Sequence, residues 1–257
     1  MRRVCRAVLV IVLVARPALA APAFDHSAFD RLLASHVENG LVDYDAFAKS
    51  PDFGQYLARL AAADPEALGT PERLSLWINA YNAYTIHVVN LHVERKSIRN
   101  IVAPGASGPA SNAWQQPVAR VGGRAYTLDQ IEHEVIRKRF PEPRIHFALA
   151  CGAMGCAPLR REAYRGDRLQ EQLQDQARLY LLGRTKGSRV DAANGVVYVS
   201  QIFSWYKDDF GGDDASIGRF IAQFYPDLVE RRVLSSGRFR LVTLPYDWSL
   251  NSTAPAR

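Results

Sequence analysis

The sequence has 257 residues, of which 48% are hydrophobic and 23% charged, the balance of a globular protein with a sizeable core. No apolar run reaches the roughly twenty residues that cross a bilayer, which argues against a membrane-spanning protein. The net charge of +6 comes without an arginine-lysine run interleaved with aromatic residues, which argues against a nucleic-acid-binding surface.

Residues 1–20 have the pattern of a secretory signal peptide. Arg2, Arg3 and Arg6 precede an apolar run over residues 7–14, and Ala18-Leu19-Ala20 is a small-x-small cleavage site. Cleavage there would remove Cys5 and four arginines, which lowers the net charge to about +2. We therefore expect an exported chain, periplasmic or secreted, with no stable membrane anchor after cleavage and with Cys151 and Cys156 as its cysteines.

The first part of the exported chain is predicted to be helical. Apolar residues recur at helical spacing over residues 25–38, Gly40 ends that helix, and Asp45 is placed to cap a second helix to about Ala62 with an interruption near Pro51. Thr70-Pro71 then starts a helix to about residue 93. Its buried face includes His87, and Asn79 and Asn82 lie on a neighbouring face.

Residues 94–126 are rich in loops, with a hairpin predicted at Gly122-Gly123. A capping box at Thr127 and Gln130 opens a helix to about Phe140, with Glu132 in or beside its apolar stripe.

Residues 145–150 form a short apolar run that we interpret as a strand ending at Cys151. A strand that ends in this way leaves the following backbone N–H groups without ladder partners, at a place suited to chemistry or to a ligand.

The remaining elements are shorter. Asp167 is placed to cap a helix that ends near Gly183, and Asn194-Gly195 indicates a type I′ hairpin. Ser200 can cap a short helix over residues 202–209, residues 215–225 form another helix, and residues 238–244 alternate as a strand. With no repeat and no domain boundary, we expect a single helix-rich α+β domain over residues 21–251 with a small mixed or antiparallel sheet, followed by a disordered tail at 252–257.

Five blocks of residues, in this order, resemble the domain of unknown function 547 family, which occurs in exported bacterial proteins and in plant proteins that carry a leucine-zipper segment. The blocks are Trp77–Tyr84, Leu128–His133, Ile145–Leu149 running into Cys151 and Cys156, Ile202–Tyr206 with Asp209 and Phe210, and Tyr246–Asn251. The resemblance covers roughly residues 65–251 and implies a fold and a residue set, but no established reaction. The family's second cysteine is usually followed by two prolines, whereas here Ala157 precedes Pro158.

The first functional hypothesis is a thiol-dependent hydrolase or acyl transferase that acts on an amide or ester. Cys151 would be the nucleophile, with unpaired backbone N–H groups after it as an oxyanion hole. His87, with His133 as the second choice, would be the general base, and Glu132 would orient the imidazole as in papain-like sites. Because side chains alternate along a strand, His146 should face away from Cys151 unless a bulge intervenes.

Two alternatives remain open. A metal site could use Cys151 or Cys156 with two of His87, His133 and His146, although the spacing matches no closed zinc motif. A disulfide between Cys151 and Cys156 would instead fit an exported protein, and the domain would then be a non-enzymatic binding or scaffold module.

Further polar residues are candidates for binding. The amides of Asn79 and Asn82 either line a pocket or, as we prefer, bond backbone groups of a neighbouring loop. Asp247 is interpreted as anchoring the C-terminal segment against the Trp77 helix rather than as an acidic member of the site.

An aromatic rim for the ligand is also predicted. Trp205 and Tyr206, together with Asp208 and Asp209, would form it, although aromatic residues at this spacing are more often core. The partner would be a small molecule or a peptide. No cofactor is expected, since the chain has neither a phosphate-binding loop nor a dinucleotide fingerprint.

Overall fold

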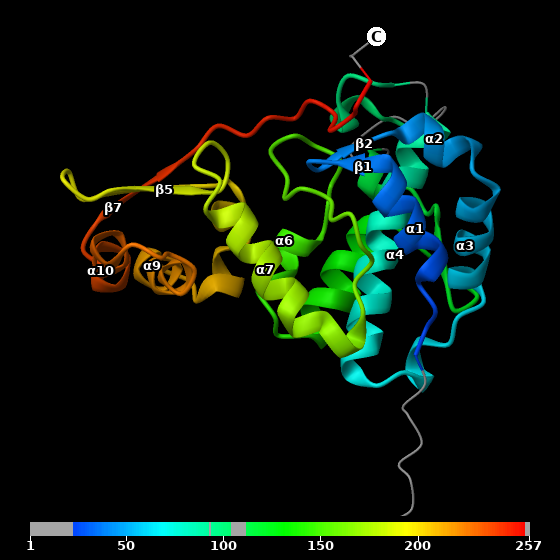
Figure 1. Ribbon diagram of the computed structural model, residues 1–257, viewed down its shortest axis with the longest axis horizontal. Coiled ribbons are helices and arrows are strands. Elements are labelled where there is room, and N and C mark those ends of the chain that lie inside the picture. The colour runs from blue at the N-terminus through cyan, green and yellow to red at the C-terminus, as the bar shows by residue number, and fades with distance from the viewer. Residues whose placement is uncertain (1–22, 93, 104–111, 255–257) are drawn as a thin grey trace, which may run out of the picture.

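The computed structural model describes residues 23–92, 94–103 and 112–254, and its centre is the helix α4 (Thr70–Leu91) (Figure 1). Every residue of α4 from Leu74 to Val89 is buried except His87. The sequence predicted burial on one face only, and the helix is instead enclosed on nearly all sides. The polar groups inside it therefore need partners from the surrounding loops.

Other helices precede and follow α4 in the chain. They are α1 (Ser27–His36), α2 (Tyr44–Lys49), α3 (Pro51–Ala61), α5 (Arg137–Arg139), α6 (Ile145–Ala148), α7 (Leu169–Leu181), α8 (Ile202–Trp205), α9 (Asp214–Ala222) and α10 (Leu228–Ser236). A π-helix, η5 (Gln130–Ile136), precedes α5. Short 3-10 turns are η1 (Pro65–Ala67), η2 (Ile98–Asn100), η4 (Ala113–Gln115), η6 (Gly166–Arg168) and η7 (Lys207–Phe210).

The strands form small sheets. Two hairpins pair β1 (Val37–Glu38) with β2 (Leu41–Val42) and β3 (Ala119–Val121) with β4 (Arg124–Tyr126). The third sheet is mixed: β5 (Ser188–Asp191) is antiparallel to β6 (Val196–Val199), and β7 (Arg240–Thr243) is parallel to β6. Figure 1 shows this sheet with α9 and α10 at one end of the molecule and α1 to α4 at the other. The described residues thus form the single helix-rich α+β domain that the sequence predicted.

Several local predictions are confirmed. Thr127 and Gln130 form both hydrogen bonds of the capping box, each 3.0 Å long. The predicted hairpin turns are present at Gly122-Gly123 and at Gly195, which adopt positive φ angles that favour glycine. Pro51 interrupts the second predicted helix and begins α3, but Asp43 rather than Asp45 caps α2.

The predicted strand at residues 145–150 is wrong, because residues 145–148 form the helical turn α6. The N–H of Phe147 donates to the carbonyl of Arg144 at 3.0 Å, and the N–H of Leu149 donates to that of Ile145 at 3.0 Å. A short apolar run can be buried in either conformation, so its composition could not distinguish them. After this turn Leu149 is extended, and the chain continues through Ala150 to Cys151.

Asn82 supplies the partners that a neighbouring strand would give to this extended piece. Its Nδ2 donates to the carbonyl of Ala148 at 3.0 Å, and the N–H of Ala150 donates to its Oδ1 at 2.8 Å. Asn79 does the same for Tyr164, with distances of 2.7 and 2.9 Å. The preferred interpretation of both amides, as partners of loop backbone, is therefore confirmed.

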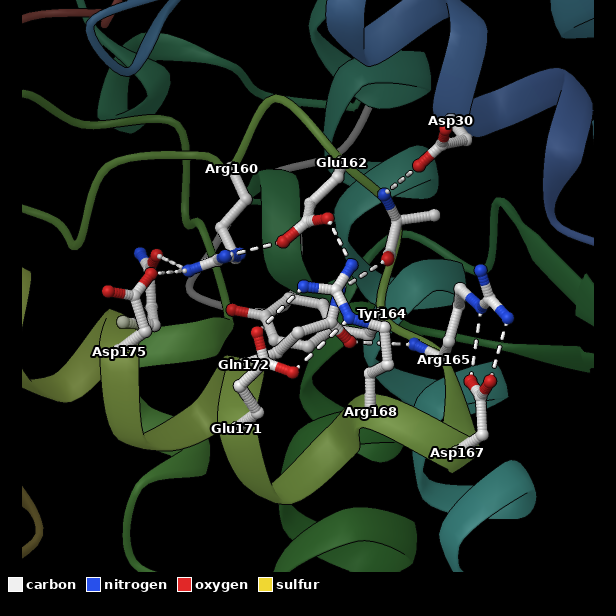
Figure 2. A network of polar contacts seen from close by, with 12 residues as sticks. Asp30, Arg160, Glu162, Tyr164, Arg165, Asp167, Arg168, Glu171, Gln172 and Asp175 are labelled. Carbon is white, nitrogen blue, oxygen red and sulfur yellow. Dashed lines mark hydrogen bonds and ion pairs between the residues drawn. The ribbon is translucent and has the colours of Figure 1, made fainter.

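The loop that leaves Cys156 is held on α7 by ion pairs (Figure 2). Arg160 pairs with Glu162 and Asp175 at 2.5 and 2.6 Å, and Arg168 pairs with Glu162 and Glu171 at 2.9 and 2.8 Å. Asp167, predicted to cap a helix, pairs instead with Arg165. These pairs bind residues 160–171 to one another and so limit the movement of the chain beyond the cysteines.

The end of the chain packs back onto its beginning. The N–H of Thr253 donates to the carbonyl of Val42 at 3.0 Å, and Ser252 forms a bridge with the same residue. The predicted disorder is therefore wrong for 252 and 253, whereas 255–257 lie outside the described residues. The predicted signal peptide at residues 1–20 also lies outside them. Within the described ranges, no helix has both the length and the apolar character needed to cross a membrane.

We predict that Asn82→Ala lowers the free energy of unfolding by about 3 kcal/mol, since it leaves a buried N–H and a buried C=O without partners. Gln55→Ala, at an exposed position of α3, should change it by less than about 0.5 kcal/mol. Urea unfolding followed by circular dichroism measures both. An Asn82→Ala protein as stable as Gln55→Ala would contradict the structural role given to the amide.

Candidate functional site

A cavity of about 710 Å³ opens where α4, η5, α6, α8 and the C-terminal segment meet. Its floor consists of buried side chains, and its walls and mouth are largely aromatic. The buried lining residues are Tyr81, Glu132, His146, Leu149, Cys156 and Ile202. The other lining residues are Arg99, Trp114, Asp129, His133, Cys151, Gln201, Trp205, Tyr206, Tyr246 and Trp248.

Cys151 is half-buried in this cavity, and Cys156 lies buried behind it. Both thiols are free, and the N–H of Cys151 donates to the sulfur of Cys156 at 2.9 Å. The sulfur of Cys151 lies 3.3 Å from the hydroxyl of Tyr246. The predicted disulfide is therefore not formed in this structure, although the two side chains are neighbours.

The two thiols differ in acidity. The hydrogen bond with Cys156, together with burial, raises the pKa of the Cys151 thiol well above its ordinary value. Burial also acts to raise the pKa of Cys156, but hydrogen bonds from the thiol and the N–H of Cys151 outweigh it and lower that pKa overall. The arrangement therefore favours a thiolate on Cys156, the deeper sulfur, over one on Cys151.

The turn after Cys151 is shaped by glycine. Gly152 has a φ of +85°, and a Cβ at this position would lie 2.9 Å from the Cδ1 of Ile98. Gly155 is equally confined, because a Cβ there would lie 2.9 Å from the backbone nitrogen of Asp247. The N–H of Gly152 makes no hydrogen bond within the described ranges, whereas those of residues 154 and 155 donate to the C-terminal segment.

His146 is held at the cavity floor by a carboxylate. Its Nε2 lies 2.7 Å from Oδ2 of Asp209, and Arg137 binds both oxygens of the same carboxylate at 2.6 and 2.8 Å. These hydrogen bonds, from His146 and then from Arg137, lower the pKa of Asp209. An ionised carboxylate only accepts, so Nε2 of His146 carries the proton and Nδ1 faces Glu132, whose Oε1 is 3.9 Å away.

Aromatic stacking fixes the imidazole plane. The ring of Tyr206 lies 3.9 Å from that of His146 at an interplanar angle of 24°, and Arg137 lies over the Tyr206 ring at 5.0 Å. Burial, followed by the charge of Glu132, raises the pKa of the Tyr206 hydroxyl, which therefore stays protonated.

Glu132 and His133 are neighbours in the π-helix η5, and both line the cavity. A π-helix has a wider turn than an α-helix and is frequent at functional sites. His133 accepts a hydrogen bond from Arg137 at its Nδ1, at 3.0 Å, because a guanidinium can only donate.

The structure does not place His87 at Cys151, and its predicted role as the base is corrected. His87 lies two residues after Thr85 on α4. The methyl of Thr85 would lie 3.6 Å from a Cβ added to Gly152. Two residues along an α-helix turn the side chain by about 200°, so His87 points away from Gly152. It is half-buried beside Tyr84, outside the cavity lining. The predicted outward orientation of His146 is also wrong, since that residue is on a helical turn.

Other candidates lie near the cavity without lining it. Asn79 and Asn82 bond backbone groups, as described above. Asp247 is exposed and accepts from the N–H of Ser249, and its carbonyl accepts from the N–H of Gly155. It therefore anchors the C-terminal segment to the cysteine turn rather than to the Trp77 helix. Within the described residues, no three His, Cys, Asp or Glu side chains are grouped so that they could hold a metal ion.

Sequence reasoning missed several lining residues, namely Tyr81, Arg99, Trp114, Tyr246 and Trp248. Trp205 and Tyr206 do line the cavity, as the predicted rim requires. The carboxylate that orients the histidine is Asp209, which had been assigned only to that rim. The concentration of tryptophan and tyrosine at residues 246 and 248 was a usable signal, because such residues are common in binding sites.

We predict that Cys156→Ala accelerates alkylation of Cys151. Cys156 is the largest cause of the raised pKa of Cys151, so its removal lowers that pKa and increases the thiolate fraction at a given pH. The initial rate with iodoacetamide at pH about 7.5, followed by intact mass, should rise at least about threefold. Met154→Leu, in the same turn, is the control for loosening and should leave the rate unchanged. A rate in Cys156→Ala at or below that of the wild type would contradict the assigned acidities.

The family model described as "Protein of unknown function, DUF547" matches residues 65–181. This range includes α4, η5, α6, both cysteines and α7. It ends before α8 and the C-terminal segment, which supply the rest of the cavity. Neither the curated proteins nor the solved structures contain a match to the chain.

Proposed function

We propose that this chain, which belongs to the DUF547 family, is a thiol-dependent hydrolase or acyl transferase that acts on an ester, thioester or amide. The supporting observation is that one cavity contains the half-buried thiol of Cys151 and the carboxylate-held imidazole of His146. A nucleophile, a histidine and an orienting carboxylate are the groups that acyl transfer requires.

The assigned nucleophile is Cys151 and the assigned base is His146 in place of His87. Because the pKa of Cys151 is raised, its thiol must lose a proton as it attacks the carbonyl carbon. The free Nδ1 of His146 accepts that proton, directly or through Glu132, while Asp209 stabilises the resulting imidazolium. The new C–S bond replaces the bond to the leaving group, which departs with the proton.

The negative oxygen of the tetrahedral intermediate needs a hydrogen-bond donor. We assign this role to the N–H of Gly152, which directly follows the nucleophile and is free of other partners in the described chain. The N–H of Cys151 itself is committed to the sulfur of Cys156. A water molecule then hydrolyses the acyl-enzyme, or an acceptor takes the acyl group.

A second candidate is a non-enzymatic binding module at the same cavity. One observation in its favour is that six aromatic side chains line the cavity. A second is that the sulfur of Cys151 contacts the hydroxyl of Tyr246, and not an imidazole, within the described residues. Under this alternative the thiol takes no part in chemistry. Export to the periplasm or beyond is likewise our proposal and rests on the pattern of residues 1–20 alone.

We predict that p-nitrophenyl acetate transfers one acetyl group to Cys151, detected by intact mass and located by peptide mapping. His146→Ala should slow this step by about 100-fold, the lower end of what a general base contributes. His87→Ala is the matched control, and its rate should stay within about twofold of the wild type because the imidazole faces away from the cavity. Cys151→Ala should accept no acetyl group.

Two outcomes would be decisive against this assignment. Equal acetylation rates for His146→Ala and the wild type would show that His146 is not the base. The absence of any acyl-enzyme would favour the non-enzymatic binding module.

A further inference from the structure

The mouth of the cavity differs in charge from its floor. At the floor, Glu132 is buried, and Asp129 lies nearby with a pKa that burial raises. At the mouth, Arg99 and Trp205 are exposed, and Arg99 is the only lysine or arginine of the described lining. The site is thus acidic at one end and cationic at the other.

Aromatic rings surround the cationic end. The ring of Trp248 lies 4.6 Å from that of Tyr246, 5.6 Å from that of Trp205 and 6.1 Å from that of Trp114. The guanidinium of Arg99 lies over Trp248 at 5.0 Å from the ring centre. This stacking restricts the side chain without using its hydrogen-bond donors.

Among the described residues, no carboxylate pairs with Arg99. It forms no ion pair within the described residues, in contrast to Arg137, whose guanidinium is bound by both oxygens of Asp209. The residues outside the described ranges contain no Asp or Glu, so the sequence holds no further acidic side chain for it. A stacked arginine with free donors at the mouth of a cavity is suited to a carboxylate from a ligand.

We propose that Arg99 selects substrates whose acyl chain ends in a carboxylate, which rests on the proposed acyl transfer at Cys151. The carboxylate of such a substrate pairs with Arg99 over the face of Trp248, and its chain passes between the aromatic walls. Its carbonyl then lies at Cys151. The opposite orientation would bring the carboxylate against Glu132 and is disfavoured by repulsion.

The chemistry is the same as for a neutral ester. The sulfur of Cys151 forms a bond to the acyl carbon, the bond to the leaving oxygen breaks, and the thiol proton goes to the base and then to the leaving group. Hydrolysis by water releases the dicarboxylic acid and restores the thiol.

The test compares mono-p-nitrophenyl esters of succinic, glutaric and adipic acids with p-nitrophenyl esters of butanoic, pentanoic and hexanoic acids. For at least one chain length, the wild-type kcat/KM should be about tenfold higher for the carboxylate ester than for the neutral ester. A factor of about ten corresponds to the free energy of one charge-assisted hydrogen-bonded pair. Arg99→Ala should reduce this ratio to about one, mainly through KM, and Arg99→Lys should retain part of it. Arg189→Ala removes an arginine stacked on Tyr198, outside the cavity lining, and should retain the full ratio.

A binding measurement separates the two proposals. Glutarate should change the tryptophan fluorescence of the wild type saturably, glutaramide should not, and Arg99→Ala should lose the response. Binding of glutarate without acylation by any ester would refute the acyl transfer and keep the carboxylate site. Acylation without a preference for carboxylates, in the wild type, would overturn the role of Arg99 and keep the proposed function.

Discussion

The two hydrogen bonds between Asn82 and the backbone of residues 148 and 150 are the constraint on which the site depends. They tie the chain between His146 and Cys151 to a helix that is buried on nearly all sides. An apolar residue would pack there but would leave a buried N–H and a buried C=O without partners. Asn79 repeats the arrangement at Tyr164, so α4 holds both chain segments that flank the cysteine turn. Side chains of a helix thus supply the hydrogen bonds that a neighbouring strand would otherwise make.

The second constraint is electrostatic. Asp209, His146 and Arg137 come from three separate elements, and their contacts at 2.6 to 2.8 Å connect η7 to α6 and α5. The carboxylate fixes the position of one imidazole proton, and Tyr206 fixes the plane of the ring. The free ring nitrogen is thereby directed to the side of Glu132. This ordering of the imidazole comes from the fold rather than from a ligand, as the proposed catalysis by positioned groups requires.

Much of the local structure could be predicted from the sequence, because caps and turns depend on a few neighbouring residues. Thr127 with Gln130, Pro51 and Asn194-Gly195 are examples of this kind. The site could be predicted only in part. Cys151 and Glu132, chosen for their positions at a turn and beside an apolar stripe, both line the cavity. His146 lines the cavity and His87 does not, contrary to expectation, because the orientation of His146 depended on whether residues 145–150 form a strand.

Lining residues that lie far from the cysteines in the sequence were harder to predict. Tyr246 contacts Cys151 across 95 positions of the chain, and Arg99 is placed by its stacking on Trp248. Nothing in the local pattern around Arg99 distinguishes it from an ordinary exposed arginine. Its position at the mouth follows from the packing of the C-terminal segment against the cysteine turn, where Gly155 permits close approach.

We infer that His146 presents a free Nδ1 to the cavity while Asp209 holds its Nε2 proton. Nitrogen NMR of the imidazole side chains, with two-bond correlations at pH about 8, reports directly which ring nitrogen carries hydrogen. We predict a protonated Nε2 and an unprotonated Nδ1 for His146, and we expect Asp209→Ala, which removes the acceptor, to lose this preference for Nε2. A proton on Nδ1 at this pH, in either a neutral or a cationic ring, would leave no base facing Glu132 and would contradict this inference.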